Sequence, residues 1–117
     1  MYVDGFVVPV PRRKLDAYLK LARLARKVWK EHGALEYREA VGDDVPYGKR
    51  TSFPRSVKAT DAETVIFSWI VYKSRAHRDK VLKKAMADKR FAGMDMKKMP
   101  FDTKRMIYGG FKVRVAA

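Results

Sequence analysis

The sequence lacks cysteine and contains only two histidines among its 117 residues. Without cysteine there is no disulfide framework, no thiolate nucleophile and no cysteine-bound zinc site. His32 and His77 are far apart in the chain, and neither has a second histidine at the spacing of metal ligands. We therefore expect no metal site and no cofactor.

Long apolar runs are also missing. No uninterrupted apolar stretch approaches the roughly 18 residues that a membrane-spanning helix needs, so we expect no membrane partner. The first segment, MYVDGFVVPVPRR, places its positive charges after its apolar residues and has no small-residue cleavage site, unlike a secretory signal. These features, together with the lack of cysteine, predict a cytoplasmic protein.

Acidic residues are scarce relative to basic ones, with 13 Asp and Glu against 27 Lys and Arg, a formal net charge of +14. Such a charge attracts polyanions but carries no information about the fold. One interpretation is non-specific RNA binding through phosphate contacts on two helix faces. The other is that these are the solvated outer faces of helices whose other sides pack on a sheet. The basic residues concerned are Arg13, Lys20, Arg23, Lys27, Lys30, Lys80, Lys83 and Lys84.

Apolar residues recur at the spacing of strands or helices in six segments. In chain order these are a strand over 2–10, a helix over 12–32, strands over 34–41 and 63–72, a helix over 75–88, and a strand over 104–115. Gly33 can end the first helix and Ser74 can cap the second, whose expected core face consists of Val81, Leu82, Ala85 and Met86. Longer segments with Gly and Pro, 42–60 and 91–103, read as loops. The order β-α-β-β-α-β within one domain of residues 1–117 predicts an α+β, ferredoxin-like fold: a four-stranded antiparallel sheet with both helices on one face.

The segment 63–72 is apolar on both sides of the strand that it predicts. Its two alternating sets are Val65, Phe67, Trp69, Val71 and Ile66, Ser68, Ile70, Tyr72. Two helices can cover only one face of the sheet, and the other apolar face should not meet water. We therefore expect a homodimer in which two sheets pack face to face, as in a dimeric α/β barrel.

Four stretches of the chain carry a family resemblance. These are YVDGFVVPVP at the start, DDVPYGKRTSF in the first long loop, ETVIFSWIVYKSRAHRD, and MPFDTKRMIYGGF near the end. Together they resemble the YbaA-like family, a domain of unknown function in the dimeric α/β-barrel superfamily. The resemblance implies this fold and a homodimer, and it implies no established activity.

Relatives in that superfamily include small enzymes that hold an apolar substrate between sheet and helices, often without a cofactor. The resemblance therefore suggests a site for a small, partly apolar molecule, with a few polar groups converging on it. Candidate ligand-binding residues are Asp4, Phe53, Ser68 and Trp69. Candidate catalytic residues are Asp43, Asp44, Asp102, Arg105 and Tyr108. A carboxylate among them could act as a base only if burial raised its pKa towards neutrality.

The same residues also have structural interpretations. Trp69 and Tyr108 fit a core or a dimer interface, and Asp102 fits an ion pair with Arg105 or the cap of a turn. Three functions stay open at this point: binding or conversion of a small molecule, RNA association, and a non-catalytic structural or regulatory role.

Overall fold

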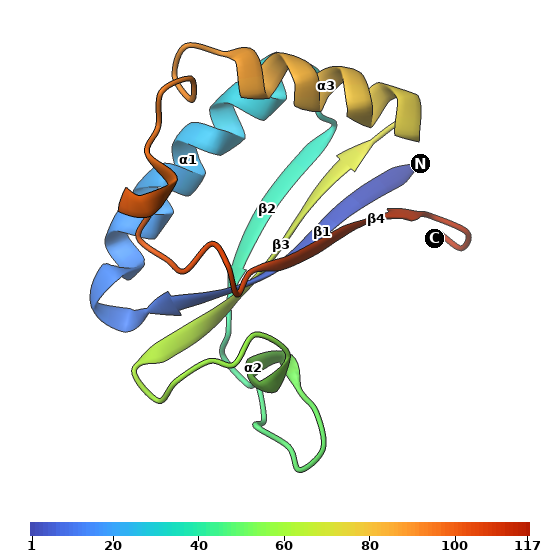
Figure 1. Cartoon of the computed structure of the whole chain (residues 1–117). Helices are drawn as coiled ribbons and strands as arrows, with labels where there is room; N and C mark the ends of the chain where they lie inside the picture. Colours follow the sequence, from blue (N-terminus) through green and yellow to red (C-terminus); the bar gives the residue numbers. More distant parts are fainter.

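Four antiparallel strands form one sheet, in the order β2-β3-β1-β4, in the computed structural model, which describes residues 1–117 (Figure 1). The strands are β1 (Tyr2–Pro11), β2 (Glu36–Val41), β3 (Glu63–Tyr72) and β4 (Ile107–Lys112). The helices are α1 (Leu15–Glu31), α2 (Phe53–Ser56) and α3 (Arg75–Ala87), with 3-10 turns at Arg12–Lys14 and Met96–Lys98. The predicted α+β class and the four-stranded antiparallel sheet are confirmed.

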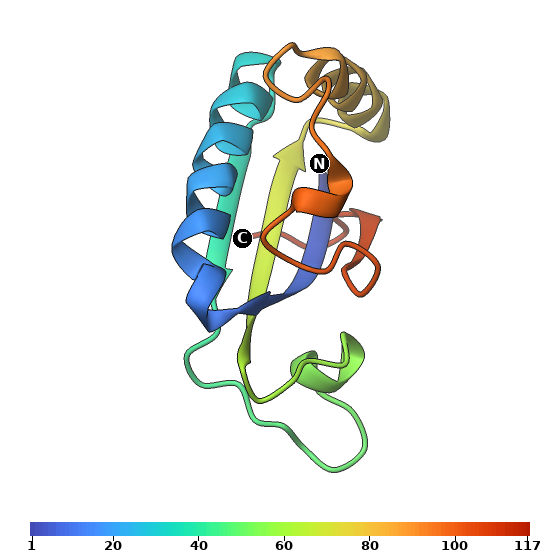
Figure 2. The same ribbon diagram turned by 60° about the vertical axis from the view of Figure 1, so that its left-hand side comes forward.

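The pairing of β1 with β3 sorts the side chains of both strands onto two faces. Tyr2 pairs with Tyr72, and the register continues residue by residue to Pro11 opposite Glu63. One face packs against α1 and α3 and forms two buried clusters. These clusters contain Tyr2, Val8, Val10, Tyr18, Ala22, Ala34, Ile66, Ile70, Tyr72 and Val81. The other face of the sheet, called here the open face, carries no long helix (Figures 1 and 2).

Helix α1 follows β1 directly because Pro11 ends the strand and begins a 3-10 turn. Tyr18, Ala22 and Val28 form its buried side, at the spacing of one helix face. The helix stops just before Gly33, whose φ of 115° is readily adopted only by glycine. This confirms the predicted helix and its glycine stop, although the first turn is 3-10 rather than α.

Helix α3 begins where the sequence predicts, because the Ser74 side chain accepts a hydrogen bond from the His77 backbone N–H at 3.1 Å. Of its expected core residues, Val81 and Ala85 are buried. Met86 was expected beside them but is 58 % exposed. Met86 is the second-last residue of the helix, and its side chain lines the edge of a cavity instead of entering the core.

Two expectations about loops and strands need correction. The segment 42–60 contains the short helix α2, capped by the Ser52 side chain, which accepts from the Arg55 backbone N–H at 3.1 Å. This helix covers one end of the open face, where Val57 packs with Val7 and Val65. The last strand spans Ile107–Lys112 rather than 104–115, because the residues before it are held in a turn by ion pairs of Arg105.

The segment 91–106 returns from the end of α3 along the same face of the sheet that α1 covers, before β4 begins (Figure 2). It thus forms a third element on that face, which the sequence did not indicate. No helix combines the length and the apolar character that crossing a membrane requires.

Candidate functional site

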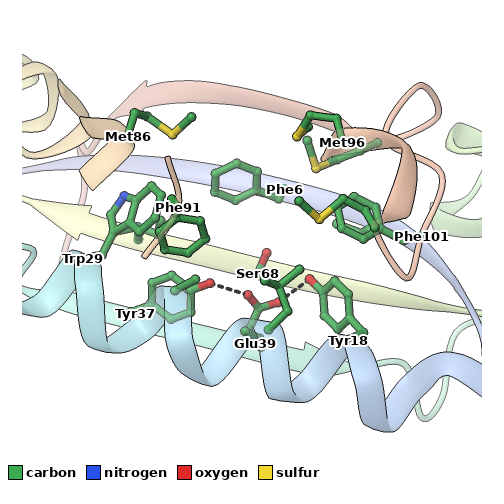
Figure 3. A pocket seen from close by; sticks show the side chains of 17 residues that line it. Phe6, Tyr18, Trp29, Tyr37, Glu39, Ser68, Met86, Phe91, Met96 and Phe101 are labelled. Atoms are coloured by element: carbon green, nitrogen blue, oxygen red, sulfur yellow. Dashed lines mark hydrogen bonds between the residues drawn. The ribbon is translucent and has the colours of Figure 1, made fainter. Parts of the chain in front are cut away.

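A cavity of about 220 Å³ lies between the sheet, α1 and the segment 91–106 (Figure 3). Fifteen of its 17 lining residues are hydrophobic. The lining consists of Phe6, Val8, Tyr18, Leu21, Ala22, Ala25, Trp29, Tyr37, Glu39, Ser68, Ile70, Met86, Phe91, Met96, Met99, Phe101 and Met106. An apolar cavity of about 150 Å³ in an engineered protein is already large enough to bind benzene, so this space has room for a larger molecule.

Two polar residues, Glu39 and Ser68, lie side by side on the sheet floor of the cavity. They are direct partners in the pairing of β2 with β3. The Ser68 hydroxyl has no hydrogen bond to the other lining residues in Figure 3. The floor therefore offers one carboxylate and one hydroxyl in an otherwise apolar surface.

Two tyrosines hold the Glu39 carboxylate in place. The Tyr18 hydroxyl donates to Glu39 Oε1 at 2.7 Å, and the Tyr37 hydroxyl donates to Oε2 at 2.7 Å (Figure 3). Burial raises the pKa of both tyrosines, and the negative charge of Glu39 raises it further. Both hydroxyls therefore stay protonated, and each carboxylate oxygen keeps a fixed direction.

The walls of the cavity are aromatic rings and thioethers. Trp29 and Phe91 meet edge to face with ring centroids 5.5 Å apart, and Tyr18 and Phe101 do so at 5.6 Å. Four methionines complete the lining: Met86, Met96, Met99 and Met106. Methionine is flexible and polarisable, so this wall can adapt to the shape of a bound molecule.

Ser68 is the one predicted ligand-binding residue that lines this cavity. Asp4 lies on the same face of the sheet but is buried elsewhere, with Oδ1 3.6 Å from Arg78 Nη1. Burial raises the pKa of Asp4, and the Arg78 guanidinium partly offsets this rise.

Trp69 and Phe53, also predicted to bind ligand, lie on the open face. They are linked through Phe67, whose ring centroid is 5.5 Å from that of Trp69 and 5.8 Å from that of Phe53. The structure therefore separates these two residues from Ser68 by the thickness of the sheet.

The predicted catalytic residues do not converge on one place. Asp102 pairs with Arg105, with Oδ2 2.8 Å from Nε, as the structural interpretation expected. Asp43 lines a separate polar groove, and Asp44 is exposed. Tyr108 is 74 % exposed and stacks on Phe6 at 6.2 Å between centroids.

The sequence did not single out Glu39, Tyr37 or Tyr18 for the site. A weak signal was present in the strand EYREAV, where Tyr37 and Glu39 alternate onto one face. A carboxylate on the face that packs against helices is unusual enough to mark a candidate site. The contribution of Tyr18 depends on how α1 crosses β2, which no local pattern reveals.

The chain belongs to a family of α+β proteins that is described as "Protein of unknown function (DUF1428)", whose model matches residues 1–103. It is also similar to the "Uncharacterized protein YbaA" of Escherichia coli strain K12, of Escherichia coli O157:H7 and of Shigella flexneri. Each is 51 % identical over 111 residues, covering 95 % of this chain and 94 % of the relative. These matches confirm the YbaA-like resemblance seen in the sequence.

Proposed function

We propose that this protein binds a small, largely apolar molecule in the cavity between the sheet and α1. The observation that carries this proposal is the cavity itself, because side chains do not fill the space between sheet and helices. Well-packed protein interiors have few voids larger than a water molecule. A lining of 15 hydrophobic residues favours an apolar ligand, and the Glu39–Ser68 pair would orient it.

Cavity filling tests this proposal. The Ala25 side chain lines the cavity, whereas Ala17 lies on the exposed side of the same helix. Small aromatic compounds should raise the melting temperature of the wild-type protein and of the Ala17→Phe control. They should not raise that of Ala25→Phe, whose ring would occupy the space. Absence of any stabilising compound for the wild type would contradict the proposal.

We also propose that the chain forms a homodimer through the open face, completing a ferredoxin-like α/β barrel. The strand order β2-β3-β1-β4 and the packing of α1 and α3 on one face support this architecture. On the open face Phe67, Ile107 and Phe111 are 44 %, 45 % and 63 % exposed. Exposed apolar side chains that gather on one face indicate a protein interface.

A second copy of the chain suits this face because the face combines a groove with a ridge. The groove has a volume of about 530 Å³, and Gly5 and Gly109, which pair with each other, form part of its lining. Phe67 and Trp69 form one wall of the groove, which is the ridge, with their ring centroids 5.5 Å apart. A two-fold axis would let the ridge of each copy enter the groove of the other.

RNA association is a second candidate function, and one observation favours it. All eight predicted basic residues on α1, α3 and the preceding turn are exposed, and none of them takes part in an ion pair. A dimer through the open face would leave these helices free. Binding of this kind should hold mixed RNA at about 50 mM salt and release it by about 200 mM. No retention at the lower salt concentration would exclude it.

A further inference from the structure

We infer that the cavity selects a protonated organic amine on an aromatic or aliphatic body, with the ammonium group bound by Glu39. This inference deepens the ligand-binding function proposed above and rests on it. It goes further because it assigns the charge and the hydrogen-bonding character of the ligand.

The charge of Glu39 favours a cationic ligand. Glu39 has no Lys, Arg or His beside it among the lining residues, and it takes part in none of the eight ion pairs of the chain. This is notable in a protein with 27 basic side chains. A carboxylate that is partly removed from water, as the half-buried Glu39 is, costs free energy unless a cation compensates it. A cationic ligand would supply the positive charge that no side chain in the cavity lining provides.

The hydrogen-bond donors and acceptors of the site also favour an ammonium group. Each tyrosine hydroxyl donates its single proton to Glu39, so only its oxygen lone pairs are left to accept a hydrogen bond from a ligand in the cavity. The carboxylate oxygens also have unused lone pairs. Apart from the Ser68 hydroxyl and the Trp29 indole N–H, the polar side-chain atoms of the site are therefore acceptors. An ammonium group, with three donors and no acceptor, complements this set, whereas a carboxylate ligand would not.

The aromatic wall of the cavity favours a cation as well. Trp29 and Phe91 line the cavity together with Tyr37, and their π faces attract cations. Such attraction strengthens where water is excluded. Aromatic rings around a single carboxylate thus favour an amine over a neutral alcohol of the same shape.

Four compounds with closely similar skeletons test the inference: phenethylamine, phenethyl alcohol, phenylacetate and ethylbenzene. We expect calorimetric titration at neutral pH to show that phenethylamine binds about tenfold tighter than ethylbenzene, which corresponds to about 1.4 kcal/mol. Phenethyl alcohol should fall between them, and phenylacetate should not bind. In Glu39→Gln the amine should lose its advantage, while the affinity for ethylbenzene stays unchanged.

The outcomes separate this inference from the proposed function. If none of the four compounds binds the wild-type protein, both are overturned. If all four bind equally, or phenylacetate binds best, the cavity is a ligand site but the amine inference is overturned. Amine preference that survives in Glu39→Gln overturns it as well. Should Glu39→Gln fail to fold, Glu39→Met provides the second test: it removes the charge and keeps a similar volume, so the amine should lose its advantage there too, and an advantage that remains would contradict the role of Glu39.

Discussion

Arg105 binds both carboxylate oxygens of Glu63, with Nη1 2.8 Å from Oε1 and Nη2 2.6 Å from Oε2, across 42 residues of the chain. The same guanidinium donates to the Lys58 carbonyl oxygen at 2.9 Å and to Asp102 at 2.8 Å. Glu63 begins β3, and Arg105 lies near the end of the segment 91–106. This paired contact therefore fixes one wall of the cavity to the central sheet.

Replacing Arg105 with methionine should destabilise the fold by about 3 kcal/mol, because the buried Glu63 carboxylate would lose its cation. Urea unfolding followed by circular dichroism measures this loss. Arg114→Met is the matched control, because Arg114 is exposed and takes part in no ion pair. If Arg105→Met lowers the free energy of unfolding as little as the control does, the Arg105–Glu63 ion pair does not stabilise the fold.

Acid should destabilise the protein through Glu63. Hydrogen bonds from Arg105 hold the pKa of Glu63 below its usual value of 4.5. Because the folded pKa is lowered, the stabilisation is complete above pH 4.5 and is lost as the pH falls through the folded value. The free energy of unfolding, measured from pH 6 down to pH 3, should fall more steeply in the wild type than in Arg105→Met. Parallel curves for the two proteins would refute this linkage.

Phe67→Lys should convert the proposed dimer to a monomer of 13.5 kDa, because it places a charge in the middle of the open face. Light scattering after size exclusion measures the mass. Val115→Lys serves as control, since Val115 is 91 % exposed near the end of the chain. The wild-type dimer should also tighten as salt increases, because salt screens the repulsion between two chains of charge +14. A wild-type monomer would contradict the proposed interface.

Gly110→Ala should destabilise the edge of the sheet by about 2 kcal/mol through overpacking. A Cβ atom at this position would lie 2.3 Å from the Tyr2 hydroxyl oxygen, which also accepts a hydrogen bond from Arg78 at 3.2 Å. A double-mutant cycle checks the cause. In the Tyr2→Leu background, Gly110→Ala should lower the free energy of unfolding by much less. An equal loss of stability in both backgrounds would show that Gly110→Ala acts through the backbone and not through a clash with Tyr2.

The strands and the two long helices could be predicted because local patterns determine them. The two-sided apolar character of β3, the Ser74 cap and the Gly33 stop all act within a few residues of their position. Helix α2 escaped prediction because four residues carry almost no periodicity. The start of β4 was not predicted, because it depends on the ion pair of Arg105 with Glu63, which is remote in sequence.

The candidate site was predictable only in its location and in Ser68. A small-molecule site between sheet and helices was an expectation from the family resemblance, and the structure contains a cavity there. Its carboxylate belongs to Glu39, held by Tyr18 from α1 and by Tyr37 from β2. That arrangement depends on how α1 packs across β2, which is a property of the tertiary structure and not of the local sequence.

Four of the six methionines of the chain line the cavity, and Met86 and Met96 are also 58 % and 59 % exposed. Peroxide converts such a thioether to a sulfoxide, which is polar and chiral. Oxidation would therefore place polar oxygen atoms on the apolar wall of the cavity while sparing the buried core of the sheet. The proposed ligand binding should be lost under oxidative stress before the protein unfolds, and methionine sulfoxide reduction should restore it.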